Sequence, residues 1–252
     1  MGVRVFDDVP AFCGHRGSGK GSVGGARENT LDSYRAAVAG GLEWVEVDAR
    51  TTADRVLVAR HDPVVDDGRF IADLTAEETD ALGLMRIADL FDDLPGHVAV
   101  DVDIKTALED ALRPADETTA ALTAGLMAGE QGRRRLLATS FDPAALLIVR
   151  ERAPELPLGL ITWTRFPLRK AIPAAAHLGV DVVAAQFESF PLDGGPVRLG
   201  EREASRSVDV AHAAGLQVAA WCPPSGAAEQ LISAGVDCLV VDDVLAHIAA
   251  RG

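Results

Sequence analysis

Four short clusters of charged residues in the first half of this chain follow or interrupt apolar, β-prone runs. They are His15-Arg16-Gly17, Glu46-Val47-Asp48, His61-Asp62 and Asp101-Val102-Asp103-Ile104-Lys105. Charge in such runs costs desolvation free energy unless a partner offsets it. Two histidines, several carboxylates and two cations near one rim would suit metal-assisted chemistry on an anion.

The carboxylates are spaced so that they would converge. Alternate side chains of a strand share a face, so Glu46 and Asp48 point together, and so do Asp101 and Asp103. Carboxylates that lie so close together raise one another's pKa, and a divalent hard cation would relieve their mutual repulsion. No pair of histidines or cysteines stands at ligand spacing, so oxygen ligation favours Mg²⁺ or Ca²⁺ over Zn²⁺. The alternative is an acidic rim neutralised by basic neighbours, namely Arg50, Arg60 and Lys105.

The two histidines are suited to acid–base chemistry. His15 ends the first predicted strand, and His61 is followed by Asp62, a partner that would define its tautomer and raise its basicity. Two histidines beside a phosphodiester would serve as base and acid for the oxygens exchanged at phosphorus. Arg16 and Lys105 are the nearest cations, and they would either bind an anionic substrate or neutralise the acidic cluster.

The elements that must position these residues alternate between apolar β-prone runs and Ala-rich amphipathic runs, which is typical of a parallel sheet built from βα units. Eight such repeats in a chain of this length indicate an α/β fold, a (β/α)8 or TIM barrel. The predicted strands cover residues 10–15, 44–50, 98–104, 136–141, 157–163, 180–186, 216–221 and 237–242.

One further β-prone run, residues 56–60, is not needed by the barrel. It precedes an acidic stretch, and we interpret residues 56–85 as a small insertion between the second strand and its helix. The whole chain, residues 1–252, is then predicted to form a single domain.

An open doubly wound sheet is the competing fold, because Gly19–Gly24 matches the dinucleotide-binding pattern GxGxxG. That pattern must turn directly from strand into helix, whereas the predicted helix begins at Asn29-Thr30. The stretch also resembles a P-loop, but Gly21 stands where a Ser or Thr must bind magnesium. We interpret residues 17–25 as a glycine-rich loop over the site.

The composition narrows the classes of partner. The chain has 252 residues, 48% of them hydrophobic, and a net charge of -14, so nucleic acid and anionic membrane surfaces are not expected as partners. Cys13, Cys222 and Cys238 lack the spacing of a disulfide framework or a zinc site. No stretch suits a signal peptide or approaches the roughly 20 apolar residues of a membrane span. We therefore expect a cytoplasmic protein without a stable membrane anchor; no pattern indicates an oligomeric state.

Taken in order, these motifs resemble those of the glycerophosphodiester phosphodiesterase family. They are His15-Arg16-Gly17, Glu28-Asn29-Thr30, Glu46-x-Asp48, His61-Asp62, Asp103-Ile104-Lys105, Ser140-Phe141-Asp142, Trp221 and Gly235-Val236-Asp237. The resemblance implies a TIM-barrel hydrolase of lipid and glycerol metabolism that converts glycerophosphodiesters, such as glycerophosphocholine or glycerophosphoethanolamine, to glycerol 3-phosphate and an alcohol.

The resemblance also implies a role for each matching residue. His15 and His61 correspond to the acid–base pair. Arg16 and Lys105 correspond to residues that face the phosphate, and Trp221 to an aromatic residue near the glycerol. The metal ligands, for Mg²⁺ or Ca²⁺, correspond to three carboxylates, namely Glu46, Asp48 and Asp103.

Three features depart from the family pattern. Asp103 replaces the usual Glu, and we expect Asp101 to compensate by joining the metal shell. The loop Ser18–Arg27 is longer than usual and adds two cations near the phosphate. Residues 63–67 replace the common Arg-Thr-Thr after the His-Asp pair, so the insertion is expected to cover the site differently.

Two other functions compete with this one. A phospholipase-D-like barrel would act on lysophospholipids and form a cyclic phosphate, although the acidic composition disfavours it. A non-catalytic barrel would bind phosphorylated ligands without turnover, which the Asp103 substitution allows. An amidohydrolase-type barrel is disfavoured, because its paired His-x-His is absent from the first strand.

Overall fold

The computed structural model describes residues 4–195 and 200–244, in which eight parallel strands form a closed ring. The first strand, β1, pairs in parallel with both the last strand β11 and the second barrel strand β4, which closes the barrel. The (β/α)8 prediction is confirmed, and the open doubly wound sheet is wrong. The eight strands are β1 (Ala11–Gly14), β4 (Trp44–Thr51), β6 (Ala99–Ile104), β7 (Leu136–Ser140), β8 (Leu158–Ile161), β9 (Val182–Gln186), β10 (Gln217–Trp221) and β11 (Cys238–Val241).

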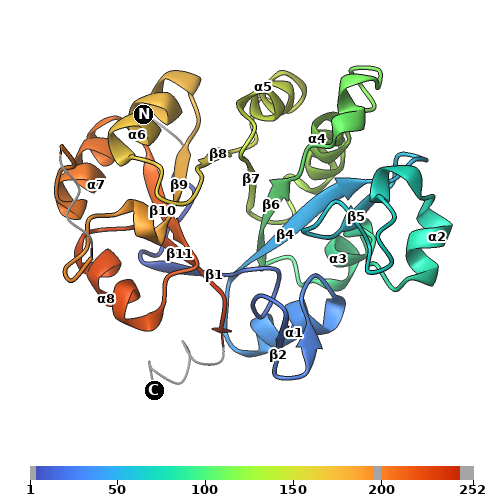
Figure 1. Ribbon diagram of the computed structural model, residues 1–252, viewed down its shortest axis with the longest axis horizontal. Helices are drawn as coiled ribbons and strands as arrows, with labels where there is room; N and C mark the ends of the chain where they lie inside the picture. Colours follow the sequence, from blue (N-terminus) through green and yellow to red (C-terminus); the bar gives the residue numbers. More distant parts are fainter. Residues whose placement is uncertain (1–3, 196–199, 245–252) are drawn as a thin grey trace.

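Helices cover the outside of the ring, as Figure 1 shows. As predicted, the helix after the first strand begins next to Thr30, whose hydroxyl accepts a hydrogen bond from the Ser33 amide. Another helix ends at Gly179, which adopts the left-handed conformation at φ 74°. The helices that follow strands of the ring are α1 (Leu31–Ala39), α4 (Thr119–Glu130), α5 (Pro143–Arg152), α6 (Leu168–Leu178), α7 (Ala204–Ala213) and α8 (Ser225–Ser233).

The β4–β6 connection contains the extra elements. Strand β5 (Leu57–Ala59) pairs antiparallel with the end of β4. The short helices η1 (Ile71–Asp73) and α2 (Ala76–Ala81) follow, and a small apolar cluster that includes Val58 and Ile71 packs beneath them. Helix α3 (Ile87–Asp93) then packs against the barrel. In Figure 1 the β5–α2 segment extends outward beside β4.

The barrel interior has two different ends. Strand β4 alternates, so Val45 and Val47 face the helices while Trp44, Glu46 and Asp48 face inward. At the amino-terminal end of the strands the interior is apolar, and Phe6 contacts Trp44 edge to face at a centroid distance of 5.2 Å. The carboxyl-terminal end is where the fold places active sites, and there the inward residues are charged.

Two short strands form a hairpin between β1 and α1. Strands β2 (Ser22–Val23) and β3 (Ala26–Arg27) are antiparallel and joined by Gly24 and Gly25, whose φ angles of 58° and 88° suit a two-residue hairpin turn. The GxGxxG segment is therefore a hairpin entry and not a nucleotide-binding turn. Near its start, Gly19 has φ 135°, and a Cβ atom there would lie 1.6 Å from the carbonyl oxygen of Asp242.

Two further one-turn helices, η2 (Leu108–Ala111) and η3 (Phe187–Ser189), lie in the connections after β6 and β9. Within residues 4–195 and 200–244, no helix combines the length and the apolar character that crossing a membrane requires.

Candidate active site

Four carboxylates enter the charged end of the barrel from two adjacent strands. In the parallel register of β4 and β6, Glu46 pairs with Asp101 and Asp48 pairs with Asp103. Because register neighbours point to the same side of a sheet, all four side chains face the barrel interior. All four residues are buried.

Three of these carboxylates converge. Glu46, Asp48 and Asp103 each offer an oxygen, and these oxygens lie within 4.8 Å of one another. Buried Oε1 of Glu46 and Oδ1 of Asp103 have no hydrogen-bond partner among the described residues. Asp101 does not join this group, so the expectation that it would enter the metal shell is wrong. Its Oδ1 instead accepts a hydrogen bond of 2.8 Å from Thr139 of β7.

Burial and crowding separate the pKa values of these carboxyl groups. Burial, together with the charges of Asp48 and Asp103, raises the pKa of Glu46 well above its ordinary value. Burial also raises the pKa of Asp101 to about 8. Asp48 behaves differently because Lys105 and Arg16 outweigh its burial and lower its pKa. Crowded buried carboxylates of this kind attract a cation.

Two cations face the carboxylates. Nζ of Lys105 lies 3.0 Å from Oδ1 of Asp48 and also contacts Asp103. Despite burial, these two carboxylates raise the pKa of Lys105. Nε of Arg16 lies 3.3 Å from Oδ2 of Asp48, and its Nη1 donates a 2.9 Å hydrogen bond to Glu28. Of the three basic residues that the alternative proposes as partners of the acidic rim, Lys105 pairs with the cluster, whereas Arg60 pairs with Asp66 and Arg50 donates to the His61 carbonyl.

The loop after β1 adopts an unusual backbone to reach the cluster. Arg16 has φ 53°, a conformation that costs free energy for a residue with a side chain. Its backbone amide donates a 2.8 Å hydrogen bond to Oε2 of Glu46. Nδ2 of Asn29 donates a 2.8 Å hydrogen bond to Oδ2 of Asp48, and Oδ1 of Asn29 accepts a 2.8 Å hydrogen bond from the Tyr34 hydroxyl. The strained loop is therefore held by the same carboxylates that it surrounds.

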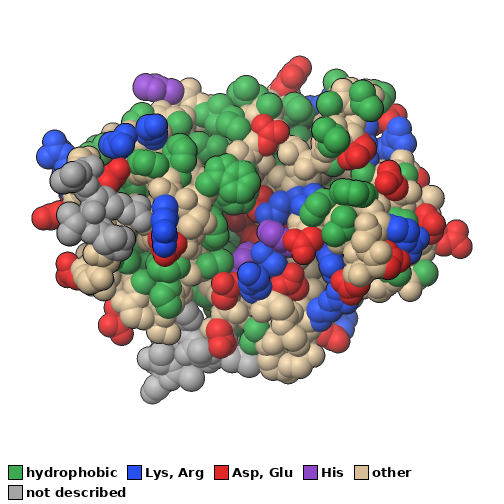
Figure 2. All heavy atoms as spheres, viewed as in Figure 1, with side chains coloured by type: hydrophobic (Ala, Val, Ile, Leu, Met, Phe, Trp, Pro, Cys, Tyr) green, Lys and Arg blue, Asp and Glu red, His purple; other side chains and the backbone are tan. Residues whose placement is uncertain are grey.

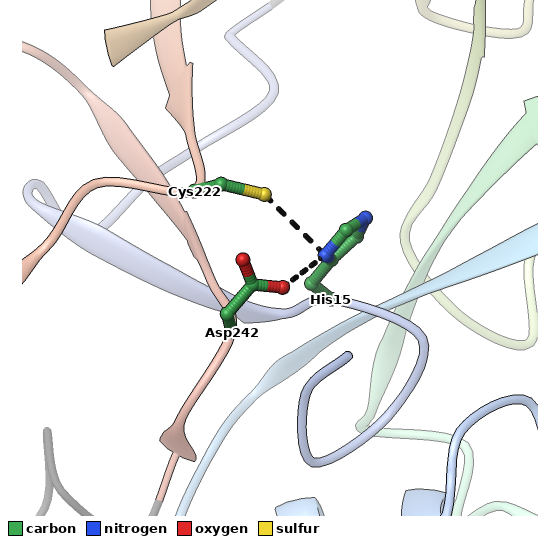
Figure 3. A group of neighbouring side chains, drawn as sticks. All are labelled: His15, Cys222 and Asp242. Atoms are coloured by element: carbon green, nitrogen blue, oxygen red, sulfur yellow. Dashed lines mark hydrogen bonds and ion pairs between the residues drawn. The ribbon is translucent and has the colours of Figure 1, made fainter. Parts of the chain in front are cut away.

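His15 follows β1 directly and is held by a residue from the other end of the chain (Figure 3). Its Nδ1 lies 2.5 Å from Oδ1 of Asp242 and 3.5 Å from Sγ of Cys222. Despite partial burial, the hydrogen bond with His15 lowers the pKa of Asp242 to about 2. Because Asp242 is then ionised, Nδ1 is the ring nitrogen that donates to it, and Nε2 lies 4.0 Å from Oε2 of Glu46.

His61 follows β5 and lies in a more open setting. Its Nδ1 is 2.8 Å from Oδ1 of Asp62, the partner that the sequence suggests. Its backbone carbonyl accepts a 2.9 Å hydrogen bond from Nε of Arg50, which ties the insertion to β4. Burial lowers the pKa of His61, although the bond with Asp62 opposes this change. At neutral pH a neutral imidazole is therefore favoured.

Both histidines line one cavity of about 370 Å³, together with Glu46, Asp103 and Lys105. Its opposite wall is aromatic. Phe141 contacts Trp163 at a centroid distance of 4.5 Å and Trp221 at 6.1 Å. Figure 2 shows a hollow near the middle of the visible face, with basic and histidine side chains along one side and hydrophobic side chains gathered on the other.

Of the eight residues to which the resemblance assigns a role, seven line this cavity, and the eighth, Asp48, contacts Lys105, which lines it. Sequence reasoning missed Asp242 and Thr139, which hold His15 and Asp101. Asp242 carried a usable signal, since it follows the apolar run Cys238–Val241 just as the other charged residues follow theirs. Thr139 carried none.

The sequence model of the glycerophosphoryl diester phosphodiesterase family matches residues 15–246 of this chain. No curated protein matches the chain in sequence.

Solved structures share the fold. An Oleispira antarctica phosphodiesterase, determined in complex with the product sn-glycerol 3-phosphate, superimposes with a TM-score of 0.77 at 20% identity, covering 96% of this chain and 97% of its own. A glycerophosphodiester phosphodiesterase from Thermotoga maritima gives a TM-score of 0.74 at 17% identity over 97% of this chain and 99% of its own. One from Parabacteroides distasonis gives 0.72 at 19% identity, over 96% and 97%.

Proposed function

This chain belongs to the glycerophosphoryl diester phosphodiesterase family and is thus a phosphoric diester hydrolase; on that premise we propose that it cleaves glycerophosphodiesters to sn-glycerol 3-phosphate and an alcohol. The observation that carries the proposal is the meeting of two histidines, three carboxylates and two cations at one cavity of the barrel. The product complex of the Oleispira antarctica phosphodiesterase supports the choice of substrate class.

A divalent cation, Mg²⁺ or Ca²⁺, fits the three converging carboxylates. Two of their buried oxygens, Oε1 of Glu46 and Oδ1 of Asp103, have no donor among the described residues. Asp48 is the member whose pKa is lowered, so it offers a charged oxygen. Oxygen donors of this kind suit hard cations. When bound, the cation would act as a Lewis acid toward the phosphate oxygens.

The cations and the tryptophan would bind and orient the substrate. Arg16 and Lys105 lie against Asp48, so a phosphate beside the carboxylates would be within reach of both. The Nε1 group of Trp221 is buried and has no acceptor among the described residues, which leaves it free to donate to a glycerol hydroxyl. The glycerol moiety would therefore lie against the aromatic wall, and the phosphate against the cations.

His15 and His61 would transfer the protons. Each has its Nδ1 held by a carboxylate, which leaves Nε2 for the substrate. One imidazole would take the proton of the attacking hydroxyl and the other would give a proton to the leaving alkoxide. The same pair serves whether water or the glycerol 2-hydroxyl attacks phosphorus.

The test is release of sn-glycerol 3-phosphate from a panel of glycerophosphodiesters. The protein is treated with chelator, and Mg²⁺, Ca²⁺ or Mn²⁺ is then added back. Metal-dependent release that is lost in His61→Ala supports the proposal. Binding of glycerol 3-phosphate by folded protein, without turnover under any metal, would instead indicate a non-catalytic barrel.

A lysophospholipid is the second candidate substrate, because one rim of the site is apolar. Trp163 lines the cavity with 67% of its surface exposed. An acyl chain on the glycerol would cover this exposed apolar side chain. A cyclic phosphate product detected by phosphorus NMR with lysophospholipid would favour this reading over the glycerophosphodiester.

A further inference from the structure

A second cavity adjoins the first, and the proposed function leaves it unexplained. It has a volume of about 570 Å³ and lies between the β2–β3 hairpin and the residues that follow β5. Arg16 and His61 line both cavities. A group leaving the phosphate on the side of His61 would therefore enter this second cavity directly.

The lining of this cavity is basic in a protein whose net charge is -14. Four of its residues are cations and two are carboxylates, namely Arg16, Lys20, Arg27 and Arg60 against Glu28 and Asp62. Both carboxylates already have partners, since Glu28 pairs with Arg16 and Asp62 with His61. The cations thus exceed the carboxylates where a ligand would lie.

Two of the four cations are available to a ligand. Lys20 has no ion pair among the residues that the structure describes. Arg27 reaches Asp66 only at 3.3 Å, and both side chains are more than half exposed, so this pair contributes little. Arg60 is held more closely by Asp66, at 2.8 Å. Lys20 and the weakly paired Arg27 are therefore the cations that a ligand could engage at least cost.

The hairpin that carries these two cations is anchored to the site. Oε2 of Glu28 accepts a hydrogen bond from the Gly21 amide, and the Glu28 amide donates a 2.7 Å bond to the Gly21 carbonyl. The same Glu28 side chain binds Arg16. Lys20 and Arg27 thus project from a braced turn beside the phosphate-binding arginine.

We infer that this second cavity binds the leaving alcohol and selects alcohols that carry an anionic group of their own, such as a phosphate monoester. The inference rests on the proposed function, with glycerol against Trp221 and the other substituent of the diester passing His61. Lys20 and Arg27 are the residues that would determine this specificity. A cationic alcohol such as choline is the disfavoured case.

A matched pair of substrates tests the inference. Glycerophosphoinositol 4-phosphate and glycerophosphoinositol differ only by one phosphate on the leaving alcohol. At low ionic strength kcat/KM is expected to be about tenfold higher for the phosphorylated substrate, and the ratio should shrink as salt screens the attraction. In the double variant Lys20→Glu/Arg27→Glu the ratio should fall to one or below.

The control variant is Lys170→Glu/Arg206→Glu. It changes the net charge by the same amount at exposed positions of α6 and α7, and should leave the ratio as in the wild type. Binding of myo-inositol 4-phosphate, measured calorimetrically, provides a readout without turnover, and it should weaken only in the Lys20→Glu/Arg27→Glu variant.

The outcomes separate the two proposals. A ratio near one in the wild type, or an equal fall in both variants, overturns the subsite. If the protein turns over neither of these two substrates and also fails to turn over glycerophosphocholine, this result counts against the proposed function. In that event the subsite is still decided by the calorimetry, because equal binding by wild type and the Lys20→Glu/Arg27→Glu variant would overturn it.

Discussion

The two sides of the site are built from different parts of the fold. His15 follows a strand of the closed barrel, and its side chain is 14% exposed, whereas His61 follows the insertion strand β5 and is 41% exposed. The partner of His15, Asp242, is a strand-end carboxylate, while the partner of His61 is its own neighbour, Asp62, at 62% exposure. We therefore expect the barrel side to hold its groups rigidly and the insertion side to tolerate change.

The largest effect should come from removing either imidazole. His15→Ala and His61→Ala should each lower kcat by about 10²–10⁴-fold, since each loses one proton-transfer group. Steady-state kinetics with glycerophosphocholine measures the loss, and unchanged melting temperatures show that the variants are folded. Undiminished kcat in one variant would show that this histidine has no part in the mechanism. The comparison between the two sides of the site would then no longer hold.

The next effect separates the two carboxylate partners. Asp242→Asn should lower kcat on the order of 10–100-fold with little change in KM, because it removes the charge that orients and stabilises the His15 ring. Asp62→Asn should stay within about threefold, because an exposed pair contributes little. Equal losses in the two variants would show that the two sides are built alike.

Stabilisation by a bound metal should depend on the barrel side of the site alone. At a Mg²⁺ or Ca²⁺ concentration of about 100 Kd, the wild type should gain about 2.7 kcal/mol, or roughly 5–10 °C in melting temperature. Asp103→Asn should abolish this shift and Asp62→Asn should retain it. Differential scanning calorimetry with chelator as the reference measures both, and a shift retained in Asp103→Asn would exclude that ligand.

The smallest effect concerns the titration of His61. Because burial lowers its pKa, the NMR titration of its ring should have a midpoint below the ordinary value of about 6.5. Asp62→Asn should lower the midpoint further by removing a hydrogen bond that favours the charged ring.

The direction in which stability changes with pH follows from the same lowered pKa of His61. Below about pH 6.5 the unfolded chain binds this proton more readily than the folded protein, so stability falls as pH falls through that window. A His61 midpoint above 6.5 would contradict both statements.

Strand positions were predictable because their signal is local. Alternation in Trp44–Thr51 places apolar residues against the helices and charged residues inside, and this pattern can be read without any partner strand. The insertion strand was predictable for the same reason. The hairpin β2–β3 was not, because two-residue strands among glycines carry no periodic signal.

The sequence by itself determined which residue types end the strands of the barrel, and hence the histidines, carboxylates and cations of the site. Only the tertiary structure decided how they pair. It placed Asp242 beside His15 across 227 positions of the chain, and it paired Asp101 with Thr139 outside the cluster of three carboxylates. The physical reason is that barrel closure and strand register set these distances, and both arise from pairing between residues far apart in sequence.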